Sequence, residues 1–386
     1  MSHKKLNNSK GMGSIHSSNK NKQISAATTD YINYIDTAKF LGIYLMLLSH
    51  TKLGSCWLNQ YIFSFHMPLF FILSGITQKG NICGWTDFKV YFIKKFRSLI
   101  IPYLLFALLL ARGSIIDNSF ILDVIWGTRN SLVHGRSSST LWFLTCFFLS
   151  SILFNLIYLF YNKSQNVKKK YYLIATVIIL AIVGNICDYS LFPGNGLFWG
   201  MNIAITGTVL MFIGKLIKTV MPIILEKKAF IKYTFVLLLF VCASSWMLNT
   251  SALNNKEWHY VVMAVGFYGN YFLFLISAIG SSCLLLLLAK IITNKWFEYI
   301  GENTLFFIGF EEIAIKIAIN VLQSLQISSL SFIFTCVLTS IIAMILTLLL
   351  IPLINSFIPN LVGKKCSRPI SDAPWLSFLA KAEQKS

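Results

Sequence analysis

Two ionisable side chains lie within the apolar segment KFLGIYLMLLSHT, residues 39–51. Lys39 and His50 are eleven residues apart, so on an α-helix both lie on one face, separated by about 16 Å along the axis. A lysine at the middle of a bilayer costs about 2.5–3.5 kcal/mol on insertion scales. We therefore expect this polar stripe to face a bundle interior or a wet cavity, with Asp36 paired to Lys39.

A second histidine, His66, lies in the next apolar run, within FSFHMPLFFILSG. It falls in the outer half of that run, so we expect its depth to match that of His50. Two histidines at one depth can form an acid–base pair near neutral pH. Two other readings stay open: His50 as an interfacial histidine beside headgroups or loop water, and His66 as a core histidine with satisfied hydrogen bonds.

A basic cluster, Lys94, Lys95 and Arg97, precedes the third apolar run in YFIKKFRSLIIPY. One reading is an anchor at the cytoplasmic face, including contact with anionic lipid. The other is a phosphate site for a cytoplasmic cofactor, because arginine and lysine bind phosphates well. The spacing leaves both readings open.

Two adjacent carboxylates follow in GENTLFFIGFEEIAIK. Glu312 can pair with Lys316 one helical turn later. Glu311 then points about 100° away and needs another partner, such as a histidine or lysine from a different span. Alternatively, the segment is shallow and both carboxylates are wet.

These groups must be positioned by membrane helices, because the whole composition is that of a polytopic membrane protein. Of the 386 residues, 56% are hydrophobic and 12% charged, whereas soluble domains carry about 25% charge. The mean hydropathy is +0.67. The net charge of +19 does not indicate nucleic-acid binding, since the basic residues lie between apolar runs.

A bilayer is crossed by about 20 apolar residues. We expect an all-α bundle of about ten spans with soft edges: 36–52, 57–78, 98–115, 140–161, 171–188, 197–219, 231–248, 268–291, 299–321 and 329–354. With both ends cytoplasmic, 26 of the 33 basic residues fall in inner segments. The outer segments hold Lys52, Arg112, Arg129, Arg136 and Lys256. This alternation favours ten spans, since one missed span would reverse every later segment.

Both ends of the chain are predicted to lie outside the bundle. We expect residues 1–30 to form a disordered basic cytoplasmic tail without the apolar region of a secretory signal, and residues 364–386 to form a cytoplasmic C-terminal tail. The outer segment from Arg112 to Ser139 carries Arg129 and His134 and could touch an anionic or sugar-containing acceptor, or be a solvated loop. The eight cysteines have no metal spacing, so we predict no metal site.

Several of these stretches together resemble acyltransferase family 3, the membrane O-acyltransferases. The similar text is DTAKFLGIYLMLLSH, YIFSFHMPLFFILSG, KKFRSLIIPY, LWFL at 141–144, YGNYFLFLISAIG at 268–280 and IGENTLFFIGF at 300–310. Lys39 and His50 match the family's motif of a basic residue, a ten-residue gap and a histidine. The resemblance covers residues 31–363. Two departures are Lys39, where many members have arginine, and Glu311, near which many members have a histidine.

The resemblance implies transfer of an acetyl group from acetyl-CoA to a hydroxyl of a surface glycan, such as O-antigen, or its lipid-linked precursor, at a bacterial inner membrane. We expect His50 to act as the base, or to attack the thioester itself, with His66 and Glu311 as further catalytic residues. Lys39 and Asp36 would shape the donor track, and Lys94 and Arg97 would hold the donor phosphates. The alternative is a transporter or flippase of a lipid-linked glycan or small anionic solute, which internal repeats would favour; none is evident.

Overall fold

The computed structural model describes residues 33–51, 53–54, 56–78, 82–111, 118–134, 137–164, 167–226, 228–253, 259–325, 331–364 and 366–376. The expected N-terminal tail, together with Lys52, Arg112, Arg136 and Lys256, lies outside these residues. Within them the chain is helical, and the one β-type pairing is an isolated bridge between Val262 and Phe267.

A helix over residues 33–49 comes first. The other long helices are α2 (Trp57–Thr77), α7 (Trp142–Lys163), α8 (Lys169–Ile186), α9 (Met201–Glu226), α10 (Lys228–Ser251), α11 (Tyr271–Ile292), α13 (Thr304–Ser324) and α14 (Phe332–Phe357). The shorter ones are α3 (Trp85–Lys95), α4 (Ile101–Leu109), α5 (Asn118–Trp126), α6 (Arg129–His134) and α12 (Lys295–Glu302). A π-helical turn, Phe96–Ile100, joins α3 to α4.

Seven helices in the described part of the chain are long and apolar enough to cross a membrane: α2, α7 with the turn before it, α8, α9, α10, α11 and α14. They confirm the polytopic membrane bundle and match seven of the ten expected runs. In the part of the chain that the structure describes, the other three runs are also mainly helical but fall short of this standard. The helix over 33–49 and α4 are shorter, and α13 carries Glu311, Glu312 and Lys316. The total of ten spans and their orientation stay predictions.

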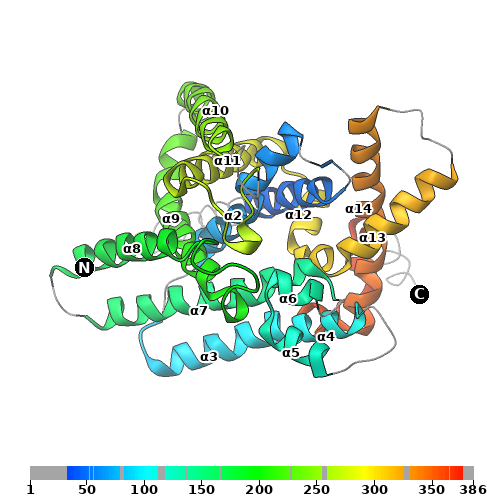
Figure 1. Ribbon diagram of the computed structural model, residues 1–386, viewed down its shortest axis with the longest axis horizontal. Coiled ribbons are helices and arrows are strands. Elements are labelled where there is room, and N and C mark those ends of the chain that lie inside the picture. The colour runs from blue at the N-terminus through cyan, green and yellow to red at the C-terminus, as the bar shows by residue number, and fades with distance from the viewer. Residues whose placement is uncertain are drawn as a thin grey trace, which may run out of the picture.

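Helix α2 lies near the middle of the bundle, and 78% of its apolar window is buried (Figure 1). It packs against α9 and α11. Helix α8 extends to the side, and only 6% of its window is buried. A helix that is apolar yet unburied by protein presents its side chains to lipid, so α8 marks the lipid-facing edge and α2 the protein core.

Two glycines allow α2 and α9 to approach closely. A Cβ at Gly75 of α2 would overlap the backbone carbonyl of Met211, and one at Gly214 of α9 would overlap the carbonyl of Ile72. Because lipid is as apolar as the helix surfaces, close backbone packing at small residues is a principal source of helix association in membranes. This crossing fixes α2, which carries His66.

Candidate functional site between an inner and an outer cavity

His50 follows the first helix directly, and its backbone N–H donates to the carbonyl of Met46 at 3.1 Å. Its side-chain Nδ1 contacts Oε1 of Glu311, which α13 supplies from 261 positions away. The Glu311 side chain is 2% exposed and that of His50 is 28% exposed. The partner that the sequence required for Glu311 is therefore the histidine of the first helix, and the carboxylate is buried rather than wet.

This contact determines which imidazole nitrogen is available for chemistry. A carboxylate accepts hydrogen bonds, so Nδ1–H of His50 donates to Glu311 and, in the neutral ring, Nε2 keeps the lone pair. The second carboxylate oxygen, Oε2, is buried and has no hydrogen-bond partner among the described residues. The pair thus has the arrangement of an imidazole base oriented by a carboxylate.

His66 lies beside His50, and the similar depth of the two histidines in the membrane stays a prediction. The two ring centroids are 6.2 Å apart and the ring planes are perpendicular. His66 is buried, and its Nδ1 donates to the carbonyl of Ile62 at 2.8 Å. It is therefore a core histidine whose Nδ1 has a hydrogen-bond partner. In the described part of the chain, no hydrogen bond joins it to His50.

Lys39 lies in the first half of the first helix, and its ammonium donates to Asp36 at 2.6 Å. It lines a cavity of about 240 Å³ together with Lys95, Ser74 and Thr77, and this space is named the inner cavity after the predicted orientation. Asp36 is held in turn by α12, because a Cβ at Gly301 would overlap the Asp36 backbone. The predicted Asp36–Lys39 pair is confirmed as a contact.

Two of the three residues of the basic cluster line cavities, and the two cavities differ. Lys95 lines the inner cavity, whereas Lys94 is exposed and is not among the residues lining it. Arg97 lines a neighbouring cavity of about 440 Å³ with Asn360 and Lys364. The sequence predicts Lys94 and Arg97, one turn apart on a helix, as the donor-binding residues, but Lys95, about 100° away, is the residue that shares a cavity with Lys39.

Burial lowers the pKa of Lys95 to about 8, and the positive charges of Lys94 and Lys39 act in the same direction. Burial likewise lowers the pKa of Lys364 to about 8, followed by the charge of Arg368. The Lys364 ammonium donates to Oδ1 of Asn303 and of Asn355. Lys95 and Lys364 therefore lose their positive charge in the mildly alkaline pH range.

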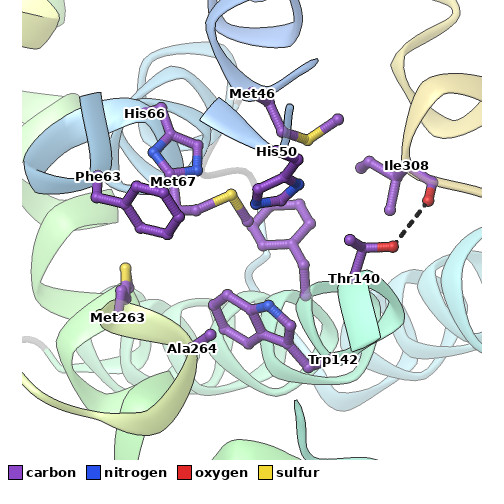
Figure 2. A pocket seen from close by; sticks show the side chains of 11 residues that line it. Met46, His50, Phe63, His66, Met67, Thr140, Trp142, Met263, Ala264 and Ile308 are labelled. Carbon is purple, nitrogen blue, oxygen red and sulfur yellow. Dashed lines mark hydrogen bonds between the residues drawn. The ribbon is translucent and has the colours of Figure 1, made fainter. Parts of the chain in front are cut away.

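His50 lies where two further cavities meet. A small chamber of about 40 Å³ is lined by both histidines, and it shares Phe143 and Ile308 with the inner cavity (Figure 2). A cavity of about 520 Å³, named the outer cavity after the same predicted orientation, shares His50, Phe63, Thr140, Trp142 and Ala264 with this chamber. The three spaces thus follow one another from Lys39 to Arg129 and Tyr260, and His50 borders the last two.

The outer cavity contains groups that suit a polar, ring-shaped ligand. It is lined by Arg129, Tyr260, Trp142 and the Glu312–Lys316 pair, whose N–O distance is 3.0 Å. The predicted Glu312–Lys316 pair is confirmed. Arg129 reaches the cavity from the outer segment, whereas His134 of that segment pairs with Asp123 at 2.6 Å. Tyr260, from the connection before α11, carried no sequence signal.

A helical membrane bundle with a carboxylate-oriented histidine between an inner and an outer cavity defines a multi-pass membrane protein with an enzyme-like site. Residues 32–351 match the acyltransferase domain of acyltransferase family 3. The chain belongs to this family, and the protein is a membrane-bound acyltransferase. A comparison with individually curated proteins finds none that matches.

Proposed function

We propose that the protein is an O-acetyltransferase of a bacterial inner membrane. It moves acetyl from acetyl-CoA to a hydroxyl of a cell-surface polysaccharide, such as O-antigen, capsule or exopolysaccharide, or of its lipid-linked precursor. The observation that carries the proposal is the buried Glu311 holding His50 at the junction of two cavities. A donor and an acceptor entering from opposite ends would meet at Nε2 of His50.

In the reaction, Nε2 of His50 takes the proton of the acceptor hydroxyl while the oxygen attacks the thioester carbonyl. The C–O ester bond forms, the C–S bond breaks, and the imidazolium returns its proton to the departing thiolate. Glu311 keeps the ring in the required tautomer and stabilises the imidazolium. In a second route, Nε2 of His50 attacks the thioester, the C–S bond breaks with release of the CoA thiolate, and the acceptor oxygen then displaces the imidazole from the acyl-imidazole, with its proton passing to the thiolate.

The donor would enter from the inner end. The extended arm of acetyl-CoA would lie in the inner cavity beside Lys39 and Lys95, and Asp36 would keep the Lys39 ammonium in place. Arg97 and Lys94 would hold the phosphates at the entrance, since guanidinium and ammonium groups bind phosphate well. His66 would form the chamber wall beside the reacting carbonyl.

The acceptor would bind in the outer cavity. The rings of Trp142 and Tyr260 offer apolar faces for a sugar, and Arg129 offers hydrogen-bond donors for its oxygens. The wide outer cavity and narrow chamber favour this direction of entry over the reverse. A transporter would use the same polar track, but membership of an acyltransferase family favours the enzyme.

The test is ester-linked acetyl on the surface polysaccharide of cells carrying the wild type, His50→Ala or no gene. NMR before and after mild alkali would show the ester, with equal membrane expression of both proteins as the control. We expect alkali-labile acetyl with the wild type alone. Equal acetyl with His50→Ala would remove this histidine from the chemistry, and no acetyl in any strain would refute the proposed donor or acceptor.

A further inference from the structure

The small chamber is lined by aromatic and apolar side chains on several sides. The rings of Phe143, Trp142 and His66 and the side chain of Ile308 line it together with three methionines, Met46, Met67 and Met263. In Figure 2 the thioether of Met67 lies between Phe63 and His50. All three methionines are buried, so their side chains are held by packing against the protein.

The chamber volume sets a limit on what can lie beside His50. A water-sized group requires roughly 10–15 Å³ in this measure. A chamber of about 40 Å³ therefore accepts about three or four non-hydrogen atoms. An acetyl group consists of a methyl, a carbonyl carbon and a carbonyl oxygen and matches this size. A butyryl group needs two further carbons and exceeds it.

The neighbouring cavities cannot impose the same limit. The inner cavity of about 240 Å³ and the outer cavity of about 520 Å³ are several times larger. A thioester that approaches Nε2 of His50 from the inner cavity reaches it at the chamber, which both His50 and the inner-cavity residues Phe143 and Ile308 border. With the acceptor in the outer cavity, the acyl chain lies in the chamber.

We infer that the chamber walled by Met67 and Met263 selects short acyl donors, acetyl above all, and that Met67 is the principal specificity-determining residue. This inference rests on the proposed function and narrows its donor class. Met67 follows His66 directly on the buried helix α2, and its thioether lies next to His50 in Figure 2, so shortening this side chain widens the chamber beside the imidazole. Replacing methionine by alanine removes roughly three non-hydrogen atoms, about the room that a butyryl chain lacks.

The experiment compares donors on the full-length protein in membranes. Acetyl-, propionyl- and butyryl-CoA are supplied separately to membranes of a host strain that retains its own glycan acceptor, and thiol release is measured above a His50→Ala background. We expect the wild type to favour acetyl over butyryl at least tenfold. Met67→Ala should reduce that ratio about tenfold, and Met263→Ala should reduce it less.

Met211→Ala is the matched control. Met211 is a buried methionine on α9 that faces α2 but does not line the chamber. The readout is the ratio of the rates with acetyl-CoA and with butyryl-CoA, measured on portions of one membrane preparation, so a lower amount of folded protein cancels. Met263→Ala provides a second chance to observe the shift if Met67→Ala is not inserted.

Three results would overturn the inference: a wild type without preference for short chains, chamber variants with an unchanged ratio, or an equal shift in Met211→Ala. Acetyl turnover with an unchanged ratio would refute the chamber's role and leave the proposed function intact. No turnover of any acyl-CoA would refute both.

Discussion

At the scale of residues, the contact between His50 and Glu311 carries most of the chemistry. A buried carboxylate is costly unless it is paired, and Glu311 is 2% exposed with one oxygen on the imidazole. Removal of either partner would therefore leave a buried polar group unpaired and lower the stability of the fold. A buried pair of this kind at the junction of two cavities is typical of a functional site.

Glu311→Gln tests the orienting role. The amide keeps the size of the side chain but loses the charge that stabilises the imidazolium and fixes its tautomer, so we expect kcat to fall by about 10²–10⁴ with a small change in donor KM. The neighbouring change Glu312→Gln should lower kcat far less, because its carboxylate pairs with Lys316. Steady-state kinetics in membranes measures both, and equal losses in the two variants would contradict the role of Glu311.

Lys95 predicts a pH dependence of donor binding. Its pKa is lowered to about 8, so its charge is present at pH 7 and is lost as the pH rises through 8. If the ammonium attracts the anionic donor, KM for acyl-CoA should rise by up to about tenfold between pH 7 and pH 9. Lys95→Arg keeps its charge over this range and should flatten the profile. An identical rise in Lys95→Arg would assign the titration to another group.

At the scale of elements, the α2–α9 crossing holds the histidine-bearing helix in place. Gly214→Ala introduces a Cβ against the carbonyl of Ile72, and the helices must separate. Overpacking of this kind costs about 1–3 kcal/mol, so we expect the Tm of the detergent-solubilised protein to fall by about 1–4 °C.

Gly84→Ala is the control for this prediction. A Cβ there meets no described atom closer than 3.6 Å, and the residue has an extended backbone that alanine adopts. A thermal-unfolding measurement on both variants separates the close crossing from a general effect of removing glycine. Equal Tm values would show that α2 and α9 can separate at no cost.

At the scale of the whole molecule, the distribution of basic residues predicts a single orientation of the bundle in the membrane. Cys56 and Cys83 flank the two ends of α2, and Cys366 follows α14. With both chain ends cytoplasmic, Cys83 and Cys366 face the inside and Cys56 the outside. Each is retained alone in a variant whose other cysteines are replaced by alanine or serine.

A membrane-impermeant maleimide should then label Cys83 and Cys366 only after permeabilisation, and Cys56 in intact spheroplasts. Cys83 and Cys366 are exposed, so an absence of labelling reports the side of the membrane rather than burial. Labelling of Cys83 in intact spheroplasts would show that the orientation is opposite to the predicted one. The cavity at Lys39 would then face away from the cytoplasmic donor.

Local features could be predicted from the sequence because they depend on the bilayer and on helical periodicity. An apolar run of membrane length has to be helical, since its backbone groups find no other partners in lipid. The Asp36–Lys39 and Glu312–Lys316 pairs follow from spacings of three and four residues on a helix. A similar depth for His50 and His66 is predicted from their positions within two successive runs, and the two rings lie side by side.

The site itself was decided by tertiary packing. No spacing rule joins Glu311 to His50 across 261 residues, brings Tyr260 into the outer cavity, or turns Lys95 rather than Lys94 toward Lys39. The chamber volume depends on how Met67, Phe143 and Met263 pack from three separate segments. The sequence determined which segments are helical, apolar and charged; the way these segments pack determined which side chains meet, because such contacts depend on the relative placement of helices distant in the chain.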